Sequence, residues 1–147
     1  MDCAVGRCRV MLTNKTMQAT TLTFGKAVKA GGIAGLLAAG INNLWSLLAQ
    51  VLGCIPPPGF PFAVTVSSVF PLLVGAMLYF MLVRFFPKGA LLYTAMAVLF
   101  LLLSLYPTLY YAGPDGVAPT KGFTLLTLPM HLIAGGLGIW GIPKFSR

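Results

Sequence analysis

The chain has 147 residues, of which 58% are hydrophobic and only 8% charged, and its formal net charge is +8. Soluble domains carry about a quarter charged residues, so this composition, with a mean hydropathy of +0.90, excludes an ordinary soluble domain. The ten basic residues lie at the ends of apolar runs, not in a stripe with interleaved aromatic residues, which argues against nucleic acid as a partner. The composition predicts an integral membrane protein whose main partner is the lipid bilayer.

Residues 1–25 are polar and rich in Thr, and we predict that they form a mobile cytoplasmic tail. Met1 and Met17 are alternative starts, and a chain that begins at Met17 lacks Cys3 and Cys8. These two cysteines and Cys54 are too few and too scattered for a zinc site or a disulfide framework, so no metal is expected.

Residues 26–147 form the second predicted domain, an all-α domain with four apolar segments that are long enough to cross a bilayer. A helix rises about 1.5 Å per residue and the hydrocarbon core is about 30 Å thick. We therefore expect membrane-spanning helices at approximately residues 30–53, 62–86, 90–111 and 122–142.

Small or polar residues recur at every third or fourth position of the first and fourth spans. In the first span they are Gly32, Gly35, Ala39, Asn42, Ser46, Ala49 and Gly53. In the fourth span they are Thr124, Thr127, His131, Ala134, Gly138 and Gly141. Helices in lipid associate through close packing of small residues and through polar contacts, so we expect these two faces to pack together.

Prolines mark the ends and interruptions of the predicted helices. Residues 56–58 are three consecutive prolines and predict a short outer hairpin, because proline cannot continue a helix. Pro71 should kink the second span, with nearby hydroxyls bonding the carbonyl that it frees, and Pro143 should end the fourth. The basic and apolar run before Cys54 also resembles a lipoprotein signal cut at that residue, although its apolar part is long and contains two asparagines.

The basic residues predict the orientation of the chain in the membrane. Lys121 stands alone on one side of the predicted bilayer. The other side carries Arg7, Arg9, Lys15, Lys26, Lys29, Arg84, Lys88, Lys144 and Arg147. By the positive-inside rule, both termini are cytoplasmic. We expect an up-and-down four-helix bundle in the inner, or plasma, membrane of a bacterium.

His131 is the only residue inside a predicted span whose charge can change near neutral pH, and such residues are functional candidates. Counting along the helices places His131 and Asn42 at nearly the same depth, in the outer half of the bundle. The candidate cluster consists of His131, Asn42, Asn43, Ser46, Thr127 and Ser104. It has two interpretations, an interhelical hydrogen-bond clamp or a small pocket that binds a neutral or cationic ligand or relays a proton.

No catalytic constellation is visible, since no carboxylate lies in any span and no nucleophile has a base at helical spacing. No cofactor is expected: His131 offers one axial haem ligand, but Met130 points about 100° away around the helix. Our first hypothesis is a non-enzymatic accessory or a lipid-binding or protein-binding membrane component. The alternatives are a small carrier or channel protomer, acting as a homo-oligomer or in a larger complex, and an enzyme acting on a lipid-soluble substrate.

Four short motifs also resemble those of a known family. They are an Asn late in the first span (Asn42 or Asn43), Phe60-Pro61, the Ser-x-x-Pro of residues 104–107, and Met130-His131. In order and spacing they resemble small four-helix bacterial membrane proteins, largely actinobacterial, that carry only a domain-of-unknown-function label. The resemblance covers residues 26–143 and implies a four-helix fold in a bacterial inner membrane. It implies no activity.

Overall fold

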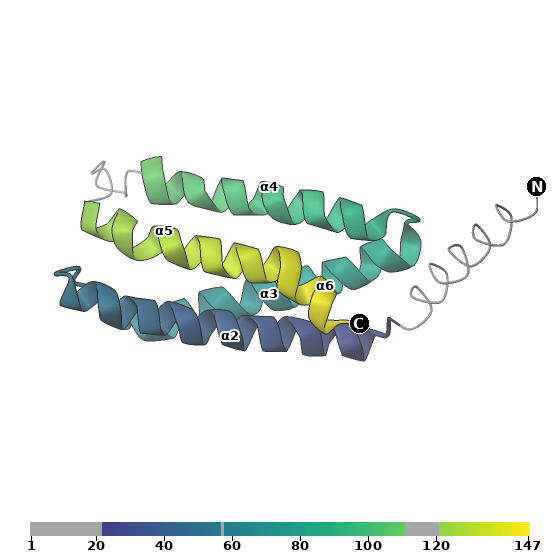
Figure 1. Cartoon of the computed structure of the whole chain (residues 1–147), viewed down its shortest axis with the longest axis horizontal. Helices are drawn as coiled ribbons and strands as arrows, with labels where there is room; N and C mark the ends of the chain where they lie inside the picture. Colours follow the sequence, from purple (N-terminus) through teal and green to yellow (C-terminus); the bar gives the residue numbers. More distant parts are fainter. Residues whose placement is uncertain (1–21, 57, 111–120) are drawn as a thin grey trace, which may run out of the picture.

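The computed structural model describes residues 22–56, 58–110 and 121–147, and all of its regular elements in these ranges are helices. The elements are α2 (Phe24–Val51), α3 (Phe60–Phe85), α4 (Gly89–Tyr110), α5 (Lys121–Gly136), the π-helical segment η1 (Leu137–Gly141) and α6 (Ile142–Phe145). The last three follow one another without a break, so the described chain folds as four long helices that lie side by side (Figure 1). Each of the four is long and apolar enough to cross a membrane, judged by length and composition.

The first helix begins earlier than the sequence predicted. α2 starts at Phe24, inside the segment that was assigned to the tail, because the Thr23 hydroxyl accepts a hydrogen bond from the backbone N–H of Lys26 at 3.3 Å and caps the helix. Residues 1–21 of the predicted tail, including Cys3, Cys8 and Met17, lie outside the described residues. The other predicted spans agree with the helices to within a few residues at each end.

The face of α2 that carries small residues packs along the fourth span, as predicted: Ala34 and Ala38 cluster with Ile142, and Ala49 with Leu126 and Met130. Its glycines, however, meet α3. A Cβ atom added to Gly31 would lie 2.6 Å from the Cβ of Ala76, and one added to Gly35 would lie 3.0 Å from the Cα of Val69. Gly32 has no neighbouring atom within 4 Å of such a position, so Gly31 replaces it on the packed face. Backbones that approach this closely leave no room for larger side chains.

Two apolar clusters fill the bundle, one towards each end. The first consists of Ala34, Ala38, Leu72, Ala76, Tyr93 and Ile142. The second consists of Ala49, Cys54, Val64, Leu126 and Met130, with Trp45 and Phe60 packed against it. Large apolar side chains are exposed on the outward faces of all four long helices, as expected for surfaces that face lipid.

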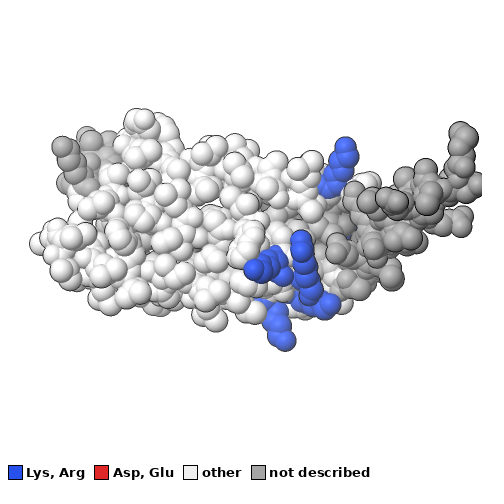
Figure 2. All heavy atoms as spheres, viewed as in Figure 1, with Lys and Arg blue, Asp and Glu red and all other residues white. Residues whose placement is uncertain are grey.

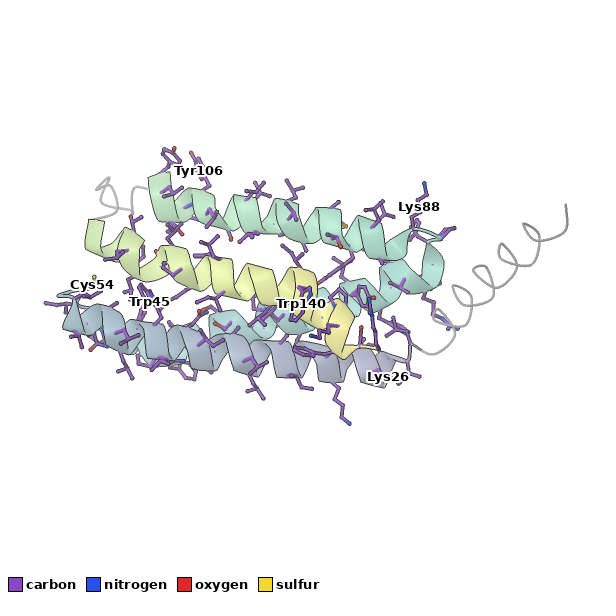
Figure 3. All side chains as sticks on the ribbon, in the orientation of Figure 1. Lys26, Trp45, Cys54, Lys88, Tyr106 and Trp140 are labelled. Atoms are coloured by element: carbon purple, nitrogen blue, oxygen red, sulfur yellow. The ribbon has the colours of Figure 1, made fainter. Side chains whose placement is uncertain are left out.

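The charged side chains that the structure describes gather at one end of the bundle, which we call the basic end. In Figure 2 the Lys and Arg side chains lie at the end of the bundle where α2 begins, the chain ends and α3 connects to α4. The described members are Lys26, Lys29, Arg84, Lys88, Lys144 and Arg147. Figure 3 shows Lys26 and Lys88 at this end and Cys54 and Tyr106 towards the opposite end.

Pro143 does not end the fourth helix, contrary to the prediction. The backbone N–H of Ile142 bonds to the carbonyl oxygen of Leu137 in a π turn, and Pro143 has no N–H to offer to the next carbonyl, that of Gly138. The hydroxyl of Tyr93 donates to that oxygen at 2.8 Å. Because a side chain of α4 satisfies the carbonyl, the helix continues through the proline to Phe145.

Pro71 lies inside α3, but the hydroxyls beside it serve other partners than the one predicted. The carbonyl that Pro71 frees belongs to Ser67, four residues earlier. The Ser67 hydroxyl donates instead to the carbonyl of Val64 at 3.2 Å, and the Ser68 hydroxyl accepts a hydrogen bond from Asn42 at 3.0 Å. No hydroxyl of the described α3 therefore bonds the freed carbonyl. Ser68, three residues before Pro71, instead forms a polar contact with α2.

Candidate functional site

Helices α2, α3 and α5 surround a cavity of about 230 Å³ in the half of the bundle away from the basic end. It is lined by Asn42, Phe60, Ala63, Val64, Ser67, Ser68, Thr127, Met130, His131 and Ala134. Three members of the predicted cluster, Asn42, Thr127 and His131, are thus brought together on the walls of one cavity.

Asn42 links three helices at the base of this cavity. Its side chain is 2% exposed, and its Nδ2 donates to the Ser68 hydroxyl at 3.0 Å and to the carbonyl oxygen of Met130 at 3.4 Å. A backbone carbonyl only accepts hydrogen bonds, so this contact assigns the amide nitrogen to the Met130 side. The carbonyl oxygen of the Asn42 side chain is buried and has no hydrogen-bond partner among the described residues.

Asn43 and Ser46 are not cavity residues, although both belong to the predicted cluster. Asn43 Nδ2 donates to the carbonyl of Ala39 at 2.9 Å and to the hydroxyl of Thr65 at 3.0 Å, so this amide joins α2 to another part of α3. Ser46 is buried one turn after Asn42, and its hydroxyl has no partner within the described parts of the chain. Neither residue lines the cavity. Asn43 joins α2 to α3 through its hydrogen bond to Thr65, whereas Ser46 makes no side-chain hydrogen bond to a described residue.

His131 and Thr127 supply the α5 wall. The Thr127 hydroxyl donates to the carbonyl of Phe123 at 2.9 Å, which is the usual bond of a helical threonine to its preceding turn. The His131 side chain is half-buried and makes no hydrogen bond to any residue that the structure describes. Asn42 and His131 therefore share a cavity but are not joined by a hydrogen bond.

Ser104 does not join the cluster. Its hydroxyl donates to the carbonyl of Leu101 at 2.8 Å, and α4 contributes no residue to the cavity wall. α4 packs instead along α5, where the Thr124 hydroxyl donates to the carbonyl of Thr108 at 3.2 Å and the Leu101 side chain lies against Gly135. Similar depth along the helix axis was not enough, because no residue of α4 reaches the cavity wall.

Sequence reasoning missed two polar contacts that hold the cavity walls. It assigned Ser68 to the proline kink, although its place about two turns into the second span already put it at the depth of Asn42. It also missed Trp45, whose indole N–H donates to the carbonyl of Leu126 at 3.0 Å and ties α2 to α5. No pattern within a single helix indicates such a partner.

The cavity is mostly apolar and uncharged, with a few polar groups on its walls. No Asp, Glu, Lys or Arg is among its lining residues, and no group of three or more His, Cys, Asp or Glu that could hold a metal occurs in residues 22–56, 58–110 and 121–147. Hydroxyl, amide and imidazole groups can hydrogen-bond a neutral molecule, whereas a buried ion needs an opposite charge. The arrangement is therefore suited to binding a neutral molecule.

Comparisons of the chain with protein-family models, with curated proteins and with solved structures find no match. The resemblance to small four-helix bacterial proteins stays a prediction. The class is defined by the structure alone: an all-helical protein with four helices that are each long and apolar enough to span a membrane.

Proposed function

We propose that this chain is a non-enzymatic multi-pass membrane protein that binds a lipid-soluble molecule in the cavity between α2, α3 and α5. One observation carries the proposal: a cavity of about 230 Å³, lined by Asn42, Ser68 and His131, lies between helices whose outer faces are apolar and exposed. Polar groups are expensive inside a bilayer, and those that line a cavity mark ligand sites more often than those sealed between helices.

We also propose that the four helices cross a bacterial plasma membrane as an up-and-down bundle with both termini cytoplasmic. The start of α2 and the end of the chain lie at the same end of the bundle, together with the described Lys and Arg side chains (Figures 1 and 2). A one-sided distribution of basic residues over short loops is the usual determinant of orientation. It supports a cytoplasmic location for the basic end.

The second candidate function, a carrier or channel protomer, has less support in this arrangement. Towards the basic end the centre of the bundle is filled by the apolar cluster that includes Leu72, Tyr93 and Ile142. A pathway through one chain would have to cross this cluster, whereas a binding site that opens on one side needs no such path. A homo-oligomer or a larger membrane complex remains compatible with binding.

The proposal is tested by purifying the full chain in mild detergent and identifying retained lipids by mass spectrometry. Ala63→Phe adds a ring at the exposed wall of the cavity, and Val66→Phe adds the same ring to an exposed position of α3 outside it. We expect a stoichiometric neutral lipid with the unmodified chain and with Val66→Phe, and its loss with Ala63→Phe. Equal lipid content in all three chains would contradict lipid binding in the cavity. Solute flux in liposomes that Ala63→Phe abolishes would instead support a carrier or channel.

A further inference from the structure

We propose that the cavity holds the hydroxyl head of a neutral lipid alcohol, whose hydrocarbon chain leaves the bundle at the exposed flank of α3. This inference rests on the proposed function and names the class of ligand. It is argued from the charge of the cavity, its hydrogen-bonding capacity, and the side on which it opens.

The charge of the lining excludes ionic heads. A cationic head would need a carboxylate and an anionic head a Lys or Arg, and the lining contains neither. Asn42 lies nine residues before the end of α2 at Val51, which is about 13 Å along the helix and so inside the hydrocarbon layer. A neutral head reaches this depth at far lower cost than an ion.

The lining offers more free acceptors than free donors. The hydroxyls of Ser67 and Thr127 already donate to backbone carbonyls, at 3.2 and 2.9 Å, which leaves their oxygens as acceptors. The side-chain oxygen of Asn42 is a further acceptor with no partner among the described residues, on a side chain that is 98% buried (2% exposed). A ligand that donates is therefore favoured over one that only accepts, such as an ether, an ester or a quinone.

Two lining groups can donate to the same ligand. Ser68 accepts from Asn42 and keeps its own proton free for a donor bond, and a neutral His131 has one N–H and one bare nitrogen. A hydroxyl group both donates and accepts, so a single alcohol satisfies Ser68 or His131 on one side and a lining oxygen on the other. An alcohol meets both requirements, whereas an ether, an ester or a quinone meets only one.

The shape of the cavity places the hydrocarbon chain outside it. Its volume of about 230 Å³ is below the roughly 300 to 1,000 Å³ of sites that enclose a whole drug-sized ligand, so it accommodates the head and the first part of the chain but not a whole lipid. The cavity is open on the flank of α3, where Ala63 and Ser67 are exposed.

Away from the basic end, α3 and α4 diverge (Figure 1). α3 and α4 meet near the basic end, where Gly89 packs against Leu82 and the rings of Tyr79 and Tyr93 are in edge-to-face contact. α4 supplies no lining residue farther out. Because no residue of α4 lines the cavity, its opening at Ala63 and Ser67 of α3 faces the surrounding lipid.

Trp45 provides a direct binding signal because it packs against the apolar cluster that includes Val64 and Met130, two residues that line the cavity. The full chain carrying Trp140→Phe, which leaves Trp45 as its single tryptophan, is titrated in detergent micelles with four probes of equal chain length. The probes are dodecanol, dodecyl methyl ether, dodecylammonium and dodecanoate. We expect a saturable change of Trp45 emission with dodecanol and at least about five-fold weaker binding of the other three.

Two substitutions connect the signal to the proposed contacts. Ser68→Ala and His131→Phe should each weaken dodecanol binding about two- to ten-fold, the range of one hydrogen bond. Thr65→Val is the matched control, because it removes an α3 hydroxyl that bonds Asn43 outside the cavity, and it should leave dodecanol binding unchanged. Competition with dioctanoylglycerol and with farnesol then distinguishes a glycerolipid from an isoprenoid alcohol.

The outcomes separate the two proposals. Equal binding of dodecanol and its methyl ether, lost on Ala63→Phe, would overturn the alcohol head and keep the binding function. Stronger binding of either charged probe would also overturn the alcohol head. Absence of binding by all four probes, together with no retained lipid in the purified chain, would overturn both proposals.

Discussion

The hydroxyl of Tyr93 donates a 2.8 Å hydrogen bond to the carbonyl oxygen of Gly138, the carbonyl that the π turn and Pro143 leave without a helical partner. The bond ties α4 to the fourth helical segment inside the apolar cluster nearer the basic end. Tyr93 is 2% exposed, so no water replaces the bond if it is lost.

Tyr93→Phe should therefore lower the free energy of unfolding by about 1 to 2 kcal/mol. Adding Pro143→Ala returns an N–H to the helix at the point where Gly138 lacks a donor, so in that background Tyr93→Phe should cost less than half as much. Unfolding in mixed micelles with increasing dodecyl sulfate measures all four chains of this cycle. Tyr79→Phe is the control, because it keeps the ring contact with Tyr93 and should change stability little. An equal cost of Tyr93→Phe in both backgrounds would contradict the role of Tyr93 as the donor that replaces the missing N–H of Pro143.

Gly31→Ala and Gly32→Ala should affect stability in opposite directions. The new methyl group at residue 31 would meet the Cβ of Ala76 at 2.6 Å and the carbonyl oxygen of Leu72 at 2.9 Å, and overpacking of this kind costs about 1 to 3 kcal/mol. At residue 32 the methyl group meets no atom within 4 Å, and alanine gains up to about 1 kcal/mol of helix propensity. Unfolding in the same mixed micelles measures the change in stability of both variants. Equal effects at the two positions would refute the close packing of α2 on α3.

Asn42→Leu should destabilise the bundle by about 1 to 2 kcal/mol, because Ser68 and the Met130 carbonyl both lose their donor. Asn42→Asp should be worse, since a carboxylate cannot donate to the Met130 carbonyl and adds a charge inside the bundle. A double-mutant cycle with Ser68→Ala should show coupling of about 0.6 to 1.7 kcal/mol. Full additivity would mean that the 3.0 Å contact contributes nothing.

His131→Leu should leave the free energy of unfolding within about 0.5 kcal/mol of the unmodified chain. The described residues offer His131 no hydrogen bond, so its replacement breaks none. Unfolding in micelles measures this change. A loss of about 1 kcal/mol that His131→Asn restores would instead support the interhelical clamp that the sequence left open.

The orientation is best tested at Ile55, which is 94% exposed in the connection between α2 and α3, because the neighbouring Cys54 is buried. In a chain with all three native cysteines changed to Ser, Ile55→Cys should react with a membrane-impermeant maleimide in intact cells. Lys29→Cys, at the basic end, should react only after the cells are opened. A reporter fused after Arg147 should be cytoplasmic, and the opposite pattern would reverse the proposed topology.

Much of each helix followed from the sequence because a helix in lipid must satisfy its backbone internally and must be long enough to cross. The periodicity of α2 also identified most of its packed face: Gly35, Ala39, Asn42, Ser46 and Ala49 are all buried in the structure. Depth could be counted as well, since a fixed rise per residue places Asn42 and His131 at nearly the same level and Thr127 one turn, about 6 Å, farther out. These properties belong to single helices.

Only the tertiary structure decided how each helix is turned towards its neighbours. Gly31 faces α3 and Gly32 does not, a difference of about 100° that near-uniform small residues do not reveal. Ser104 has a suitable depth but lies outside the cavity wall, and the fourth helix continues past Pro143 because Tyr93, 45 residues away in sequence, supplies the missing donor. Periodicity along one segment carries no information about the direction of its partner, so the polar groups that line the cavity were settled by packing between helices.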